Sequence, residues 1–335
     1  MIESARRARS RRLLLAAGAG AFVTTFGGWP RIGCAEPAAF PNRPIRFVLP
    51  FPPGSGTDIS ARFFAGELSQ RVKQPVIVEN HPGGNGFIGA NIVLRAPADG
   101  YTIFVGATSV FTTNVVVFKS MPFDPVKDFA PVSMMLRSPS VLVVAADAGP
   151  SSLKAFVDRA KASPGALNAG TGAVSYQLAA AAFFQRAGVR VNNIPYKGAS
   201  EVVTAAASGV VDAAIVDIGS ALPLVRGGKL RALAVSSDRR VPDLPEVPTY
   251  IESGYAGYTT FNWSGAAVPA ATPPAIVARL SELFDEIASS PAARSAFEKI
   301  SSEPVPGGAA EMRRQVASEI ERWRGIAAVA GVVPQ

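Results

Sequence analysis

Two loops rich in glycine and hydroxyl side chains have the residue types to bind an anionic ligand. The first is Pro52–Asp58 (PPGSGTD), which follows an apolar run, and the second is Gly170–Ser175 (GTGAVS). Each stands before a segment with helical spacing. Small residues let the backbone turn tightly and expose its N–H groups, and a helix N-terminus adds partial positive charge. Both loops therefore predict an anion site that needs no arginine or lysine side chain.

Each loop can also be an ordinary helix start, in which Thr57 or Asp58 caps the helix after the first loop. Capping and ligand binding are compatible at one helix N-terminus. The carboxylate of Asp58 disfavours a highly charged ligand directly above it and suits capping or the ordering of a water. Because each half of the chain has one such loop, the pair suits a small ligand with a carboxylate at each end.

The residues for several other chemistries are missing from the sequence. One Cys and one His argue against a zinc site, an iron–sulfur cluster and a disulfide framework. His81 lies in a Pro/Gly-rich stretch, where a lone His is more typical of a turn than of a general base. Neither a G-x-x-x-x-G-K-[ST] phosphate loop nor a G-x-S-x-G nucleophile elbow occurs. We expect no metal, no cofactor and no catalytic residue, which argues against an enzyme.

The stretch Gly84–Gly89 (GNGFIG) matches the G-x-G-x-x-G pattern of dinucleotide-binding proteins. That site also needs a full helix and an acidic residue about 20 positions further on. Pro97 ends the following helix early, Asp99 comes too soon, and Asp124 comes too late. We therefore interpret the stretch as a turn-rich loop.

Short apolar runs alternate with segments of helical spacing, which predicts strands and helices in alternation. The predicted strands are Ile45–Phe51, Val76–Glu79, Tyr101–Ala107, Val141–Ala145, a short one near Leu167, Asn193–Tyr196, Val211–Val216 and Leu230–Val235. The predicted helices are Asp58–Val72, Leu153–Ala162, Tyr176–Ala187, Glu201–Ser208, Pro274–Ser290 and Ala309–Val329. This order indicates an α/β protein with parallel sheets covered by helices on both faces. Ligands bind beyond the carboxyl ends of such strands, which favours the loops Pro52–Asp58, Ala107–Asn114, Gly170–Ser175 and Asp217–Ser220.

Composition indicates a folded protein of about two domains, with 335 residues of which 48% are apolar and 17% charged. The formal charge is +8, but residues 1–35 hold six Arg and one Glu. The other 300 residues hold 27 basic and 24 acidic side chains, a balance of +3. With so small an excess and no stripe of basic and aromatic residues, nucleic acid is not an expected partner.

Residues 1–35 have the pattern of an export signal peptide. An Arg-rich start precedes the apolar run Leu13–Phe26 and the small residues Gly33-Cys34-Ala35, which suit cleavage after Ala35. The run Ser10–Leu15 (SRRLLL) resembles a twin-arginine signal, and an ordinary Sec signal with extra arginines fits equally well. We expect a periplasmic protein whose signal peptide is cleaved near Ala35.

Many short motifs occur in a characteristic order from Phe40 to the C-terminus. They are PNRPI (41–45), PFPPGSGTDISAR (50–62), VIVENHPGGNGFIGA (76–90), PADGYTIFVG (97–106), MPFDPVKDFAPV (121–132), IPYKGAS (194–200), GGKLRALAVSSDRR (227–240) and LPEVPTYIESGY (244–255). On these motifs the chain resembles the substrate-binding proteins of tripartite tricarboxylate transporters, the Bug-type receptors. The resemblance implies a two-domain periplasmic-binding-protein clamshell (type II, Venus flytrap), each domain a mainly parallel sheet flanked by helices.

The resemblance also implies how the domains divide. We expect the chain to cross between them near Ser138 and Asn262. Domain 1 would then comprise residues 40–138 and 262–335, the second part contributing the C-terminal helices. Domain 2 would comprise residues 139–261.

In the family, the two glycine-rich loops grip ligand carboxylates through backbone amides, hydroxyls and ordered waters. Thr108 and Ser109 match a further cleft-facing loop, and Asp217 faces the cleft from the second domain by analogy, although a turn or cap role is the alternative. The expected ligand-binding residues are Pro53, Gly54, Ser55, Gly56, Thr57, Asp58, Thr108, Ser109, Gly170, Thr171, Gly172, Ser175, Tyr176 and Asp217.

The sequence departs from the family pattern at several of these positions. Ser55 stands where Gly is common, so a positive φ there would be strained. His81 stands where Arg is frequent. Ala173 replaces a frequent Ser, and Tyr176 stands near a frequent His. These changes favour an aromatic or less polar carboxylate over a citrate-like one.

The function implied by the resemblance is an exported receptor that closes around a small di-, tri- or aromatic carboxylate. It would deliver this ligand to the permease subunits of a membrane transporter, without a covalent step and as a monomer. Two other functions stay open at this point. One is a ligand-sensing receptor for a partner such as a sensor kinase, and the other is an exported hydrolase or isomerase that uses carboxylates.

Overall fold

The computed structural model describes residues 40–332 and residue 334. The predicted export signal, including Cys34 and the cleavage position after Ala35, lies outside the described residues. Among the residues that are described, no helix is both long and apolar enough to cross a membrane.

The first lobe is built on a sheet with the strand order β2-β1-β3-β9-β4. The strands β2, β1 and β3 are parallel, whereas β9 runs antiparallel to β3 and β4. The short β10 pairs with β4. The bounds are β1 (Ile45–Leu49), β2 (Val76–Asn80), β3 (Thr102–Ala107), β4 (Phe129–Ala145), β9 (Phe261–Pro269) and β10 (Glu303–Pro304).

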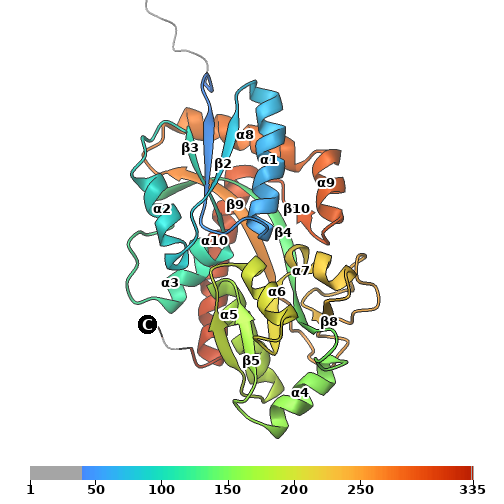
Figure 1. The fold of residues 1–335 in the computed structure, drawn as a ribbon. Helices are drawn as coiled ribbons and strands as arrows, with labels where there is room; N and C mark the ends of the chain where they lie inside the picture. The colour runs from blue at the N-terminus through green and yellow to red at the C-terminus, as the bar shows by residue number, and fades with distance from the viewer. Residues whose placement is uncertain (1–39, 333, 335) are drawn as a thin grey trace, which may run out of the picture. The chain divides into compact units, whose positions relative to one another are not determined.

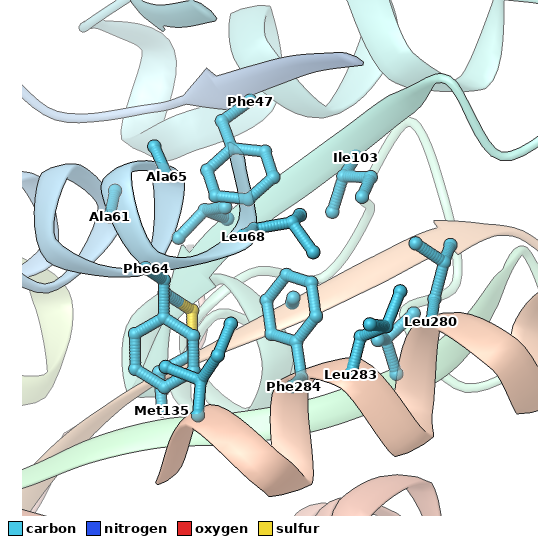
Figure 2. Packing of buried hydrophobic residues seen from close by; sticks show 14 of the residues in the cluster. Phe47, Ala61, Phe64, Ala65, Leu68, Ile103, Met135, Leu280, Leu283 and Phe284 are labelled. Atoms are coloured by element: carbon cyan, nitrogen blue, oxygen red, sulfur yellow. The ribbon is translucent and has the colours of Figure 1, made fainter. Parts of the chain in front are cut away.

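One face of this sheet packs against three helices, α1 (Gly56–Val72), α8 (Pro274–Ala288) and α9 (Pro291–Glu298). Figure 2 shows Phe284 of α8 between Phe64 of α1 and Phe47 of β1. The ring centroid of Phe284 lies 5.4 Å from that of Phe64 and 5.8 Å from that of Phe47. These contacts form the main core of the first lobe.

The other face packs against α2 (Phe87–Leu94) and the start of α10 (Gly308–Val329). The two faces follow from strand alternation, because Phe47 points to one side and Val48 to the other. The stretch Gly83–Gly86 before α2 has positive φ at all four residues, which confirms the predicted turn-rich loop.

The second lobe is built on a sheet in which β4 continues and the order is β4-β7-β5-β6, with β8 also paired to β4. Its faces are covered by α4 and α5 on one side and by α6 and α7 on the other. The strands are β5 (Asn168–Thr171), β6 (Asn192–Pro195), β7 (Ala213–Asp217) and β8 (Leu230–Val235). The helices are α4 (Leu153–Ala162), α5 (Val174–Ala187), α6 (Ala199–Ala207) and α7 (Ile218–Arg226).

Two long strands connect the lobes. In Figure 1, β4 runs from the first lobe, at the top, into the second lobe at the bottom. Its residues Phe129–Pro139 pair with β9, and from Ser140 onward it pairs with β7 and β8. The change of partner at Pro139 and Ser140 marks the point where the chain passes from one sheet to the other.

Helix α10 also contacts both lobes. Met312, near its start, packs in the core of the first lobe. Trp323 and Ala327, near its end, pack against Leu178 and Ala179 of α5 in the second lobe. The carboxylate of Glu319 accepts hydrogen bonds from the indole N–H groups of Trp323 (2.9 Å) and Trp263 on β9 (3.3 Å).

The structure corrects the predicted elements in three respects. The strand predicted at Val141–Ala145 begins at Phe129; Pro131 lies beside a bulge in its pairing with β9, which accommodates a residue that cannot donate to the ladder. The elements β9, α7 and α9 were not predicted, nor were the short β10 and α3 (Asn114–Val117). The sheets are mixed rather than purely parallel, because β4, β8 and β9 run antiparallel to their neighbours.

Candidate ligand-binding cleft

A small cavity lies where the lobes meet, beyond the carboxyl ends of β1, β3, β5 and β7. Its volume is about 40 Å³. The first lobe contributes Phe51, Ser55, Gly56, Thr57 and Ala107, and the second contributes Gly172, Ala173, Ser175, Tyr176, Ala199 and Asp217. The connecting strands form the floor with Leu136, Ser138, Asn262, Trp263 and Ser264. The strand ends therefore bring both glycine-rich loops to one place, as expected for an α/β fold.

The lobes touch across this cavity, so the described conformation is closed. The hydroxyl of Ser220 in the second lobe donates a hydrogen bond of 3.3 Å to the carbonyl of Gly54 in the first. A Cβ atom on Gly56 would lie 3.0 Å from the carboxyl carbon of Asp217, and one on Gly198 would lie 2.4 Å from Pro52. Glycine at these positions lets the two walls approach closely.

The first loop is shaped by a cap that differs from the predicted one. The N-cap of α1 is Ser55, whose hydroxyl accepts a 3.2 Å hydrogen bond from the backbone N–H of Asp58. Thr57 and Asp58 lie inside the helix instead. Ser55 has an extended φ of −74°, so the expected strain is absent, and Gly54 takes the positive φ of 79°.

Asp58 is held by several groups of its own lobe. Its carboxylate accepts hydrogen bonds from the backbone N–H of Gly54 (3.0 Å), the side chain of Asn80 (2.9 Å) and Nε of Arg62 (3.0 Å). Asp58 is only 3% exposed. Burial alone would raise the pKa of Asp58, but these hydrogen bonds and the Arg62 charge outweigh it and leave the pKa below its usual value. Asp58 thus stays ionised and fixes the turn of the loop.

The second-lobe wall is made by the starts of helices. Helix α5 begins at Val174, so Ala173, Ser175 and Tyr176 of its first turn line the cavity. Helix α6 begins at Ala199, which also lines the cavity. A Cβ on Gly172 would lie 2.5 Å from the backbone N of Ala199, so only glycine allows the start of α6 to pack against this loop.

Asp217 is the N-cap of α7, and its carboxylate accepts bonds from the backbone N–H (2.8 Å) and hydroxyl (3.0 Å) of Ser220. The hydroxyl of Tyr176 lies 3.5 Å from the same carboxylate. Asp217 is 6% exposed. Its burial raises the pKa, and hydrogen bonds from Ser220 and Gly56 offset that rise only in part. The neighbouring Tyr176 hydroxyl also has a pKa well above its usual value, because burial and the Asp217 charge both favour its neutral form.

The electrostatic character of the cavity comes from backbone rather than from cations. No Lys, Arg or His is found among the described residues that line it. The N-termini of α1, α5 and α6 meet there at Gly56, Ala173 and Ala199. Each helix start contributes partial positive charge and backbone N–H groups. The arrangement can hold an anionic group by neutral donors.

The predicted site residues divide into three groups. Seven line the cavity together: Ser55, Gly56, Thr57, Gly172, Ser175, Tyr176 and Asp217. Ser109 lines a neighbouring hollow with Gly83–Gly86. The remaining six lie outside the cavity lining, namely Pro53, Gly54, Asp58, Thr108, Gly170 and Thr171.

Two of these six residues have hydroxyls that are used within the fold. Thr108 Oγ1 accepts a 2.9 Å bond from the backbone N–H of Trp263, and Thr171 Oγ1 donates a 2.7 Å bond to the side chain of Asn193. Gly170 is closely packed inside the second lobe, where a Cβ would lie 2.9 Å from Val202. Their positions support the loops that line the cavity.

Asn262 is not among the predicted ligand-binding residues, although it lines the cavity floor. The sequence feature that could have indicated Asn262 is its isolated position in the run FNWSGAAVP, which otherwise has the composition of a buried strand. His81 lies away from the cavity, with its Nε2 3.3 Å from the carboxylate of Glu79. Within the described residues, no group of three or more His, Cys, Asp or Glu could hold a metal ion.

Comparison with known proteins agrees with this architecture. The family model described as the tripartite tricarboxylate transporter family receptor matches residues 60–332. Protein BugT of Bordetella pertussis is 35% identical over 300 residues, which cover 88% of this chain and 92% of that protein. The solved structure of R. palustris Rpa4515 with adipate has 33% identity and a TM-score of 0.86, covering 88% of this chain and all of that one.

The solved structure of the periplasmic binding protein BugD has 27% identity and a TM-score of 0.83, and covers 88% of this chain and all of that one. These likenesses confirm the predicted two-domain, type II clamshell of the periplasmic binding proteins and a receptor role rather than an enzymatic one. The chain belongs to the receptor family of the tripartite tricarboxylate transporters and is a periplasmic solute-binding protein.

Proposed function

We propose that this receptor captures a small carboxylate between its two lobes and delivers it to the permease subunits of a tripartite tricarboxylate-type membrane transporter. The observation that carries the proposal is the meeting of three helix N-termini, those of α1, α5 and α6, at one cavity between the lobes. Such ends attract anions through oriented N–H groups. The seven predicted residues that line the cavity are the proposed ligand contacts, with Ser109 beside them.

The proposed ligand is a di-, tri- or aromatic carboxylate with an apolar body. Phe51, Leu136 and Trp263 supply apolar surface around the polar groups of the cavity. A relative of 33% identity is described with adipate, a linear dicarboxylate. A pocket of apolar walls with a few placed polar groups is typical of small-molecule sites.

Capture would work by hinge closure about the connecting strands. The proposed domains are residues 40–138 with 262–335, and residues 139–261. The boundary at 138 and 139 lies beside the change of partner along β4. A ligand that touches both walls favours the closed state, because the contacts to the second wall form only when the lobes meet.

Calorimetric titration of residues 36–335 with succinate, L-malate, adipate, citrate and benzoate tests the ligand class. We expect at least one of them to bind at a single saturable site and to raise the unfolding temperature by mass action. The matched controls are the neutral amides, such as adipamide for adipate, which should bind at least tenfold more weakly. Equal binding of acid and amide, or no binding by any acid, would contradict the proposal.

We also propose that export requires the N-terminal signal and that cleavage follows Ala35. Mass spectrometry of the protein recovered from the periplasm should then give a chain that begins at Glu36 and lacks Cys34. A chain that keeps residues 1–35 would contradict this. Delivery to a permease predicts that a strain lacking the receptor loses high-affinity uptake of the bound carboxylate, and that the gene in trans restores it.

A further inference from the structure

The floor of the cavity is a pair of facing positions on the two connecting strands. Leu136 of β4 lies opposite Ser264 of β9, and Ser138 lies opposite Asn262. Residues two apart on a strand share one face, so all four side chains lie on the same side of this two-stranded ribbon. The pair Ser138–Asn262 is next to the point where β4 changes its sheet.

Among the described residues that line the cavity, only Asn262 has buried side-chain polar atoms without a hydrogen-bond partner. It is 7% exposed, and neither Nδ2 nor Oδ1 has a hydrogen-bond partner among the described residues. Elsewhere in residues 40–332, the buried side chains with an unpartnered atom are Thr113, Asn114, Ser237 and Thr272, none of which lines the cavity. A buried amide without partners is costly and rare in proteins, so its retention in a binding cavity points to a ligand.

The polar groups beside Asn262 form hydrogen bonds with other groups of the protein. The hydroxyls of Ser264 and Ser60 lie 2.8 Å apart, and the Ser138 hydroxyl donates to the carbonyl of Pro139 at 3.2 Å. Asp217, the carboxylate of the opposite wall, accepts from the backbone and hydroxyl of Ser220. None of these groups forms a hydrogen bond with the Asn262 amide.

The chemistry of an amide sets what the ligand must carry. Nδ2 offers two donors and suits a carboxylate oxygen, whereas Oδ1 only accepts. A carboxylate cannot satisfy Oδ1, because an ionised carboxylate has no proton to donate. A hydroxyl or an amine can donate a hydrogen bond to Oδ1. A ligand with such a group beside its carboxylate can therefore bond both Nδ2 and Oδ1 of Asn262.

We propose that Asn262 is a specificity-determining residue whose amide binds a hydroxyl or amine carried next to a carboxylate of the ligand. This rests on the proposed function and narrows its substrate class to hydroxy- or amino-substituted carboxylates. A site built to bond such a group rejects the analogue that lacks it, because the analogue leaves buried polar atoms unpaired.

Matched acid pairs that differ by one hydroxyl or amine test the proposal by calorimetry. The pairs are L-malate and succinate, L-aspartate and succinate, 2-hydroxyadipate and adipate, and salicylate and benzoate. We expect the wild type to prefer the substituted acid at least tenfold in one or more pairs. In Asn262→Leu that preference should fall below threefold.

Thermal unfolding of the ligand-free variants separates this role from a structural one. Asn262→Leu removes an unpartnered buried amide at similar volume, so its unfolding temperature should equal or exceed that of the wild type. Thr272→Val is the matched control, since it removes another buried unpartnered oxygen outside the cavity. It should leave the preference between paired acids unchanged.

An unchanged preference in Asn262→Leu, or carboxylate binding by the wild type without preference in any pair, would overturn the proposal while leaving the carboxylate receptor intact. A lower unfolding temperature with unchanged preference would assign Asn262 a structural role. If no acid binds the wild type, the proposed function itself fails, and this proposal fails with it.

Discussion

Asp58 and Asp217 are two buried carboxylates at helix starts on opposite sides of one cleft, and their surroundings differ. Asp58, in the first lobe, is bonded by the charged Arg62 together with Asn80 and the Gly54 backbone. Asp217, in the second lobe, is hydrogen-bonded only by neutral groups, those of Ser220, the Gly56 backbone and the more distant Tyr176. The pKa of Asp58 is accordingly lowered, whereas burial raises that of Asp217.

The difference separates a residue that builds the site from one that can respond to a ligand. An ionised carboxylate with a cation and two neutral donors is satisfied by the fold itself. Where no cation is near, the ionised form of a buried carboxylate is stabilised or destabilised by the charge that is placed beside it. We therefore assign Asp58 to the shape of the first loop and Asp217 to the balance of charge when an anion enters.

The largest effect is expected for Asp58→Ala, which removes the acceptor of three hydrogen bonds. We expect it to lower the free energy of unfolding by about 2–4 kcal/mol, since bonds to a charged group contribute about 1.5–3 kcal/mol and the Gly54 and Asn80 donors lose their partner. Urea denaturation measures this. Arg62→Ala is the control; the Arg62 side chain is 53% exposed, so its loss should cost at most about 1 kcal/mol. Equal losses in both variants would contradict the assignment of Asp58.

A pH-dependent effect of intermediate size is expected for Asp217→Asn. In the wild type, carboxylate affinity should fall as pH rises through the raised pKa of Asp217, because the ionised side chain then repels the ligand. The affinity should fall by at most about tenfold per pH unit, which is the limit when binding is coupled to one proton. Asparagine keeps the N-cap of α7 but cannot ionise, so the slope should disappear. Calorimetry between pH 5 and 8 measures the affinities of both proteins. If the affinity of Asp217→Asn still falls as pH rises, the titrating group is not Asp217.

The smallest effect is expected for Tyr176→Phe. The Tyr176 hydroxyl is 3.5 Å from the Asp217 carboxylate, at the long limit of a hydrogen bond. Removing it should change the free energy of unfolding by less than about 1 kcal/mol and leave the aromatic face in place. A loss of ligand affinity above tenfold in this variant would show that the hydroxyl binds the ligand directly.

Local patterns predicted most helices and strands, since an amphipathic segment is encoded by neighbouring residues. Leu153–Ala162 and Leu230–Val235 were predicted with their observed bounds. The first half of β4 was missed because Pro131 and Pro139 argue against a strand, and a bulge accommodates the first of them. Helix α7 was missed because it contains Pro223. The clamshell itself followed from the family resemblance rather than from any single segment.

The sequence predicted which residues line the cavity where loops after strands carry the signal, but not where tertiary pairing decides. Gly56 and Gly172 stand in recognisable loops, and both line the cavity. Thr108 was expected there too, but its hydroxyl bonds the backbone of Trp263, a partner 155 positions away. Asn262 reaches the cavity through its register with Ser138, which no local pattern records.

The central claim is that the ligand is bound between the first loop and Asp217 with the lobes closed. Calorimetric titration of Gly56→Val with a carboxylate that binds the wild type tests it most directly, because a Cβ there would lie 3.0 Å from the Asp217 carboxyl carbon. Gly66→Val, on the same helix with no atom within 4 Å, is the matched control. We predict at least tenfold weaker binding for Gly56→Val and less than twofold change for Gly66→Val. Binding of Gly56→Val as tight as that of the wild type would contradict the claim.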